Sequence, residues 1–287
     1  MYVNQAQLSL ERALADDTSL QVSYAFTKGT RIPLVQNINL APASGTLADG
    51  RNLYSTARLD ARFNNINMIT SAANSNYNGL GVNLSKRFGR SSNRLWRGLQ
   101  FNLAYTWSHA LDNAPESGIG GGSELPQDSF NRRADYGNAL SDVRHVFNTS
   151  AVFRPRFRNK LLDNNQLSLL FFVRSGNSFD GRAGTDLNRD SVNNDRPLGF
   201  DFGRNAFKAP GSAQLDARYS RFFRFGERYK LIFFAEAANV LNTPNPAAEN
   251  AAINRVFGTG TEPLATFGEV ISFREMRRVQ MGLRLDF

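Results

Sequence analysis

The stretch LQFNLAYTWS at residues 99–108 decides the fold class of this 287-residue chain. Its odd-numbered positions carry large apolar side chains, and its even-numbered positions carry mostly polar ones. The apolar set is Leu99, Phe101, Leu103, Tyr105 and Trp107, and the polar set is Gln100, Asn102, Thr106 and Ser108. Successive residues of a β-strand point to opposite faces of the sheet, so this pattern predicts a strand with one apolar and one polar face.

The same alternation recurs along the chain, from QAQLSLER near the start to VQMGLRLDF at the end. Turn residues such as those of ADDTS at 15–19 separate the alternating segments. The predicted strands cover residues 5–12, 20–26, 80–88, 99–108, 145–153, 166–175, 214–225, 229–241 and 279–287. The segment NINMITS at 65–71 alternates more weakly, and we assign it to a loop.

The connections between these segments alternate between short and long. The short connections are 15–19, 89–98, 154–165 and 226–228, and the long ones are 28–75, 109–143, 176–212 and 242–276. Transmembrane barrels have short periplasmic turns and longer extracellular loops, whereas soluble sandwiches mix their loop lengths. The sequence therefore predicts an all-β, antiparallel, up-and-down transmembrane β-barrel segment in the cell outer membrane, with residues 1–287 as a single domain.

The aromatic residues support this topology independently of loop length. The chain has 23 Phe, 8 Tyr and 2 Trp residues, and barrels gather aromatic side chains at both membrane interfaces. With the short turns on the periplasmic side, the extracellular girdle holds Tyr24, Phe26, Tyr105 and Trp107, and the periplasmic girdle holds Phe88, Phe153, Phe223, Phe225, Tyr229 and Phe287.

Two places fit the alternation poorly. Arg221 falls on the outward face of its strand, so we expect a β-bulge or a side chain that extends to the interface. Ile232 and Phe234 make their strand apolar on both faces. An inward apolar patch there would pack against something that fills the lumen.

The composition of the chain argues against nucleic-acid binding and against cysteine chemistry. The net charge is +9, but the basic residues are dispersed and no nucleic-acid-binding motif is present, so we expect no nucleic-acid partner. There is no cysteine, which removes disulfides and thiolate chemistry. A mean hydropathy of -0.40 is compatible with a barrel, because only alternate residues face lipid. The N-terminal residues do not have the pattern of a signal peptide.

Catalytic residues are scarce. The only histidines are His109 and His145, which we interpret as polar residues at strand ends. No serine lies in a G-x-S-x-G motif, and Asp16 and Asp17 lie in a turn, where aspartate is common for backbone reasons. We therefore predict that the chain is not an enzyme.

One loop, GTDLNRDSVNNDRP at 184–197, has the spacing of a calcium loop. Asp186, Asn188 and Asp190 occupy positions 1, 3 and 5, and the carbonyl of Val192 would serve position 7. The loop departs from the pattern in three ways: Ser191 replaces glycine at position 6, Asp195 falls at position 10, and position 12 has no glutamate. The candidate metal residues are Asp186, Asn188, Asp190 and Asp195. The alternative is a turn that its own Asx side chains cap.

Several motifs together resemble a known family. They are SNYNGLGVNLSKRF (75–88), YTWSHALDN (105–113), SDVRHVFN (141–148), NVLNTPNP (239–246) and the terminal Phe287. This set resembles the C-terminal barrel of TonB-dependent receptors, with the closest similarity to the Oar-like branch, whose members carry a carboxypeptidase-regulatory-like domain. The resemblance covers residue 5 to the end.

The resemblance implies a plugged barrel of about 22 strands that imports bulky ligands with energy delivered through TonB. The implied partners are outer-membrane lipid and lipopolysaccharide, the barrel-assembly machinery, which would read Phe287, and TonB through a plug. This chain contains no recognisable plug, TonB box or leading domain, and about nine of the strands.

An odd number of up-and-down strands leaves the first and last strands parallel, whereas bacterial single-chain barrels have even numbers. We therefore expect Met1 to be an internal position of a longer receptor. Two alternatives remain open. One is a passive outer-membrane channel or a smaller complete barrel, and the other is a soluble secreted β-sandwich that binds glycans or surfaces.

Overall fold

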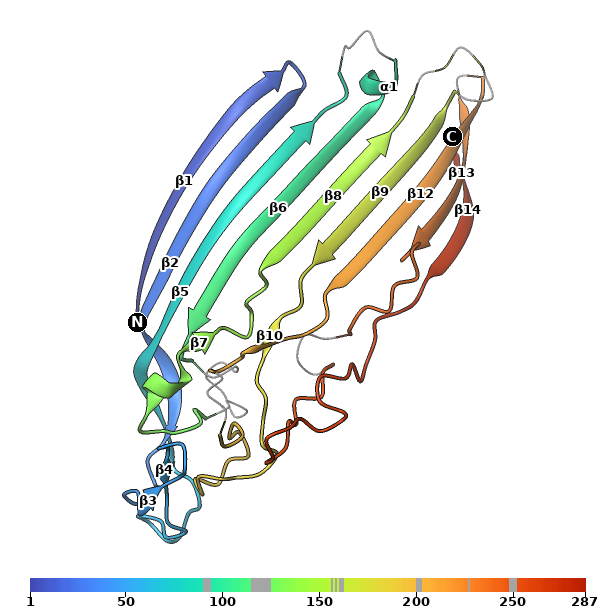
Figure 1. Ribbon diagram of the computed structural model, residues 1–287. Helices are drawn as coiled ribbons and strands as arrows, with labels where there is room; N and C mark the ends of the chain where they lie inside the picture. The colour runs from blue at the N-terminus through green and yellow to red at the C-terminus, as the bar shows by residue number, and fades with distance from the viewer. Residues whose placement is uncertain are drawn as a thin grey trace.

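The computed structural model describes residues 1–89, 94–114, 125–155, 157, 159, 163–199, 203–226, 228–247 and 252–287. Its main feature is one curved sheet of nine long antiparallel strands (Figure 1). In sheet order these are β1 (Tyr2–Ala15), β2 (Thr18–Asn37), β5 (Asn67–Lys86), β6 (Leu99–Asp112), β8 (His145–Phe153), β9 (Asn165–Arg174), β12 (Ser212–Phe225), β13 (Tyr229–Ala238) and β14 (Arg278–Asp286).

Each long strand pairs with the next long strand along the chain, which confirms the predicted up-and-down order and all nine strands. The arc is open: β1 forms one edge and β14 the other (Figure 1). Within the described residues, the remaining sheets are the two-stranded pairs β3–β4 and β10–β11. A sandwich needs two large sheets packed face to face, so the soluble β-sandwich alternative is wrong.

The register aligns the apolar faces of neighbouring strands. Leu103 of β6 lies opposite Leu84 of β5 and Thr149 of β8. Leu84 in turn lies opposite Leu20 of β2, and Thr149 lies opposite Phe171 of β9. Directly opposed residues share a face of the sheet, so the apolar sets predicted strand by strand form one continuous outward surface.

Aromatic residues lie at both ends of this outward surface. Tyr24 pairs with Leu80 and Trp107 with His145 near the long-loop end. Phe225 pairs with Tyr229 at the opposite end. Phe88 and Phe287 lie just beyond the ends of β5 and β14 and are both exposed. The two girdles therefore take the positions that the topology predicts.

The connections alternate as expected (Figure 1). The short ones are 16–17, 87–98, 154–164 and 226–228, and the second contains the helix α1 (Arg94–Arg97). The long ones are 38–66, 113–144, 175–211 and 239–277. The long connections contain β3 (Gly45–Thr46), β4 (Asn52–Leu53), the 3-10 helix η1 (Arg132–Asp135), β7 (Gly137–Asn138), β10 (Ser178–Phe179) and β11 (Phe207–Lys208). None of the helices in the described part of the chain has the length and apolarity needed to cross a membrane.

The assignment of NINMITS to a loop is wrong for most of that segment. β5 begins at Asn67, and its first residues pair with the far end of β2, with Met68 opposite Gln36 and Thr70 opposite Leu34. The hairpin thus continues beyond the wall, past a register shift next to Arg31, whose φ is 56°. It is an extension of two strands and not a separate spanning strand. The extension lies beyond the wall, so no lipid imposes strict alternation on it.

The structure resolves both departures from the alternation. β12 pairs with β9 and β13 without a register shift around Arg221, so no bulge is present there. The Arg221 guanidinium instead lies 5.2 Å from the centre of the Phe223 ring, toward the short-turn end. On the inward face, the Arg218 guanidinium lies 4.3 Å from the centre of the Phe234 ring, so an inward cation covers part of the apolar patch.

Candidate functional site in the long loops

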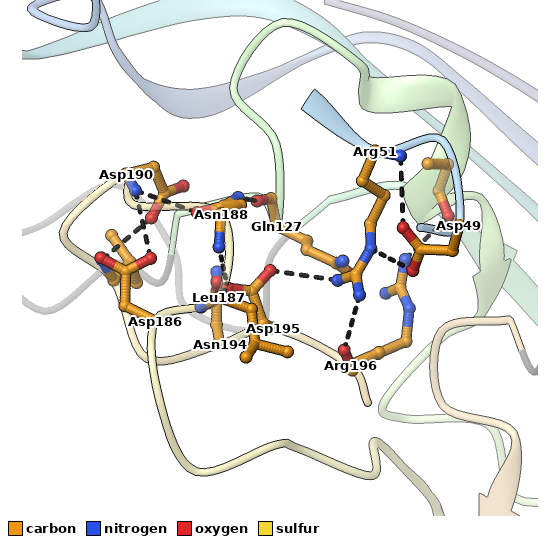
Figure 2. Close-up of polar contacts among 12 residues, drawn as sticks. Asp49, Arg51, Gln127, Asp186, Leu187, Asn188, Asp190, Asn194, Asp195 and Arg196 are labelled. Atoms are coloured by element: carbon orange, nitrogen blue, oxygen red, sulfur yellow. Dashed lines mark hydrogen bonds and ion pairs between the residues drawn. The ribbon is translucent and has the colours of Figure 1, made fainter. Parts of the chain in front are cut away.

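The predicted calcium loop is held by contacts from two other long loops, 38–66 and 113–144 (Figure 2). Tyr54 donates its backbone N–H to the carbonyl of Asn188 at 2.9 Å. The Asn188 side chain donates to the carbonyl of Gln127 at 2.6 Å. Arg51 forms an ion pair with Asp195 at 3.1 Å. Loops that are distant in sequence therefore fix the position of this segment.

The side chains of the loop bind its own backbone. Asp186 accepts from the N–H groups of Asp190 at 3.1 Å and Ser191 at 2.8 Å. Asp195 accepts from Leu187 at 2.6 Å and from Asn188 at 3.0 Å. Such contacts are typical of Asx turns. They give the loop a defined shape without any bound ion.

Ser191 takes the conformation for which the calcium pattern normally requires glycine. Its φ is 76°, in the left-handed region. The backbone therefore makes a sharp turn at position 6 in spite of the side chain, at a cost of about 1 kcal/mol or more. The Ser191 hydroxyl offsets part of this cost by donating to the side chain of Asn64 at 3.0 Å.

Three carboxylates lie near one another in this loop. Burial, together with the charges of Asp186 and Asp195, raises the pKa of Asp190 to about 7. Burial also raises the pKa of Asp195, while the N–H donors of Asn188 and Leu187 and the charge of Arg51 oppose that rise. An additional cation near Asp190 would be electrostatically favourable, because Arg51 is the one residue in the described part of the chain that forms an ion pair with these carboxylates.

The geometry does not by itself form a metal centre. Within the described residues, no three acidic, histidine or cysteine side chains are grouped as metal ligands. To bind calcium, Asp186 and Asp195 would have to release backbone N–H groups that they now accept from. Calcium binding at Asp186, Asn188, Asp190 and Asp195 therefore stays a prediction.

The prediction has a direct test. In outer-membrane vesicles carrying the natural protein, millimolar calcium should slow proteolysis within 184–197 severalfold, and Asp190→Ala should remove the difference between calcium and chelator. Protection should weaken as the pH falls through about 7, because protonated Asp190 no longer attracts a cation. Glu262→Ala, in another long loop, is the control. Equal cleavage with calcium and with chelator would leave only the Asx turn.

A second polar cluster lies beside the first and contains residues that the sequence analysis missed. Arg196 donates to Asp135 at 3.0 Å and lies 3.9 Å from Asp180. The side-chain amide of Gln127 is buried, and neither its Oε1 nor its Nε2 atom has a hydrogen-bond partner in the structure. It lines a cavity of about 30 Å³ with Arg196, a volume that suits one or two ordered waters. This cluster joins the loops 113–144 and 175–211.

A cluster of phenylalanines joins two of the long loops. Phe207 lies 4.8 Å from Phe267 between ring centres, and Phe179 lies 5.6 Å from Phe267. Phe257 completes the group at 5.1 Å from Phe267. Phe179 and Phe257 are buried, which is unusual for loop residues. The loops 175–211 and 239–277 therefore share a small apolar core.

The two histidines have separate partners. Nδ1 of His145 lies 2.8 Å from the hydroxyl of Tyr105, and Nε2 of His109 lies 3.0 Å from the side-chain oxygen of Asn138. Both residues lie toward the long-loop ends of their strands, as the sequence interpretation has it.

The concave face of the arc contains a groove of about 410 Å³ over β8, β9, β12, β13 and β14. Its polar lining includes Arg218 and Glu236, which form an ion pair at 3.1 Å, and Gln280. Its apolar lining includes Val152 and Leu170, the latter well exposed. The inward face is thus mixed in polarity, whereas the outward face is predominantly apolar.

A single curved sheet with an apolar outward face, two aromatic girdles and long loops at one end defines the wall of a transmembrane β-barrel. The chain belongs to the outer membrane beta barrel domain family, whose model matches residues 1–200 and 198–280. The protein is therefore a component of the cell outer membrane.

Among the solved structures that are similar to the chain is that of the outer membrane transporter YddB from Escherichia coli. The TM-score is 0.54 at 10% sequence identity, and the match covers 99% of this chain. The chain spans 32% of the length of that transporter. At this identity the similarity supports the fold alone: an arc that corresponds to part of a larger barrel. No curated protein matches the sequence.

Proposed function

We propose that this chain forms part of the wall of a TonB-dependent outer-membrane transporter that imports a bulky ligand. The observation that carries the proposal is the open arc, which has nine long strands and two unpaired edge strands. Lipid does not tolerate open sheet edges, because each unpaired backbone group costs about several kcal/mol there. Further strands must therefore complete the barrel. Barrels of about 16–18 strands leave an aqueous channel, whereas the barrel of about 22 strands that the resemblance implies has a plugged lumen.

The sequence motifs support the finer part of the proposal. YTWSHALDN (105–113) and SDVRHVFN (141–148) fall on β6 and β8 and on the loop between them. NVLNTPNP (239–246) follows β13 directly. The resemblance to TonB-dependent receptors, and to the Oar-like branch among them, rests on these motifs. Contact with TonB would be made by a plug and not by the residues described here.

Conductance distinguishes this proposal from a passive channel. The natural protein, purified and inserted into a planar lipid bilayer in potassium chloride, should carry no steady ion current, because a plug fills its lumen. Reading the DNA upstream of Met1 gives a second test, since the proposal expects a continuous frame that encodes a plug and a signal peptide. A steady open-channel current, with a stop codon immediately upstream, would overturn the proposal in favour of a passive channel.

We propose that the barrel-assembly machinery recognises Phe287. It follows β14, is 90% exposed, and ends the chain on an aromatic residue, the kind of terminal residue that the barrel-assembly machinery would read. Deleting Phe287 in the natural protein should lower outer-membrane insertion severalfold, as measured by the membrane fraction that is heat-modifiable on gels. The control is Phe88→Ala, because Phe88 is also an exposed aromatic residue at the same rim. Unchanged insertion would mean that Phe287 is only the end of an edge strand.

A further inference from the structure

The short-turn end of β5 and β6 carries an exposed group that no barrel strand requires. We call it the rim patch: Arg87, Phe88, Leu95, Trp96 and Arg97. Leu95 is 53% exposed, and Trp96 and Phe88 are each 45% exposed. Both arginines are exposed as well. Three large apolar side chains at the surface beside two cations need an amphipathic surrounding, which water alone does not provide.

The position of Trp96 shows which face of the wall the helix α1 covers. Its ring packs edge-on against Phe101, with 6.2 Å between the ring centres. Phe101 lies opposite Lys86 and Ala151 on the outward face of the sheet. The rim patch is therefore continuous with the outward surface at the level of the membrane interface, where tryptophan is most frequent.

A buried lysine holds the helix at this place. Lys86 occupies an outward position of β5, yet it is only 1% exposed. Its Nζ forms an ion pair with Asp17 at 2.7 Å, donates to the Arg87 carbonyl at 3.0 Å, and lies 5.1 Å from the centre of the Trp96 ring. The contacts of Lys86 join the first two short connections, so Trp96 is fixed over the wall and shields the lysine from lipid.

Backbone hydrogen bonds hold the other end of the connection 87–98. Gly98 donates to the Leu95 carbonyl at 3.2 Å, and its own carbonyl accepts from Arg154 at 2.7 Å. A Cβ at Gly98 would lie 2.7 Å from the Arg154 carbonyl, so only glycine permits this approach. The rim patch is thus a positioned surface.

The short-turn end of the chain is basic. Its four connections, 16–17, 87–98, 154–164 and 226–228, together hold nine basic and four acidic residues, and 87–98 alone holds four basic residues and no acidic one. The four long loops hold 14 basic and 16 acidic residues and so are close to neutral. Basic clusters next to a membrane attract anionic lipid headgroups. The charge at the opposite end offers no such attraction.

From this geometry we propose that the rim patch binds the headgroups of anionic phospholipids in the periplasmic leaflet. Trp96 and Leu95 lie at the boundary of the acyl chains, and Arg87 and Arg97 take the phosphate groups. Arginine suits this role because its planar guanidinium donates two parallel hydrogen bonds to phosphate. The inference rests on the outer-membrane location and holds whether or not the barrel transports a ligand.

Lipid retention tests the proposal. The natural protein, extracted in mild detergent and analysed by native mass spectrometry, should retain phosphatidylglycerol or cardiolipin. The double variant Arg87→Gln/Arg97→Gln should retain at least tenfold less, since each basic residue contributes about fivefold to binding at an anionic surface. The control is Arg274→Gln/Arg277→Gln, which makes the same change of charge in a long loop and should retain the wild-type amount. Equal retention in the two double variants would overturn the proposal.

A second measurement covers the case in which the rim variant fails to insert. The natural protein is reconstituted in vesicles that contain brominated phosphatidylglycerol or, separately, brominated phosphatidylcholine at the same fraction. The fluorescence of Trp96 is obtained as the difference between wild type and Trp96→Phe. Quenching by the anionic lipid should be at least twice that by the zwitterionic lipid. Equal quenching by the two lipids would show that Trp96 touches the bilayer without selecting its headgroups, and would contradict the proposal.

Discussion

Leu103→Arg should destabilise the barrel in a phospholipid bilayer by about 2–4 kcal/mol, whereas Asn102→Arg should change its stability by less than about 1 kcal/mol. Leu103 lies midway along the outward face of β6, between Leu84 and Thr149 on its neighbours. A charge there enters the hydrocarbon near its centre, too far from either interface for the side chain to reach water. Asn102 is one residue away but lines a second hollow of the concave face, beside Ala104 and Asn148, where an arginine stays hydrated.

The two variants form a matched pair, because they add the same side chain to adjacent positions of one strand. The measurement is equilibrium unfolding in denaturant from phospholipid vesicles, followed by Trp fluorescence and by heat-modifiable migration. If Asn102→Arg costs as much as Leu103→Arg, the two faces of β6 do not differ in environment. The outward surface would then not face lipid.

The chain expressed by itself should fail to form a stable membrane barrel. The arc has an odd number of long strands in alternating direction, so β1 and β14 run parallel and cannot close on each other as antiparallel neighbours. The outer edge of β1 is unpaired over Tyr2–Ala15 and that of β14 over Arg278–Asp286. In lipid, each unpaired group costs several kcal/mol, so the sum over the two edges exceeds the whole stability of an ordinary domain.

The expected result is aggregation, or a detergent-bound state that trypsin digests completely. The control is the natural protein, meaning the longer barrel of which we propose this chain to be a part, and in the same detergent it should resist trypsin. A monomer of residues 1–287 that resists trypsin and migrates heat-modifiably would contradict this expectation. It would favour a smaller complete barrel.

The wall could be predicted from the sequence because lipid and lumen impose opposite demands on successive residues. Most of the nine segments keep this alternation, as Leu103 beside Asn102 does, and the exceptions are Arg221 and the pair Ile232 and Phe234. Outside the membrane these two environments no longer act on the strands, and the alternation of apolar and polar residues weakens. The part of β5 between Asn67 and Ser71 pairs with β2 outside the wall, and its weaker alternation led to its assignment as a loop.

The loop contacts could not be predicted, since they join residues far apart in the sequence. Arg196 and Asp135 are 61 positions apart, and Arg51 and Asp195 are 144 positions apart. No local spacing marks such a pair. The Phe207–Phe267 contact is equally invisible, because each ring is an isolated aromatic in a polar loop. The spacing of Asp186, Asn188 and Asp190 did identify a loop of defined structure, but it does not show whether that loop binds an ion.

A lipid-quenching scan along β6 tests the central claim most directly. These 287 residues contain no cysteine. Once any cysteine elsewhere in the natural protein is replaced, single cysteines from Leu99 to Trp107 can each carry an environment-sensitive fluorophore. With a quencher attached to the lipid acyl chains, labels at odd positions should be quenched strongly and labels at even positions weakly, with a period of two residues. A period near 3.6 residues, or uniform quenching at all nine positions, would contradict the account of this chain as the wall of an outer-membrane β-barrel.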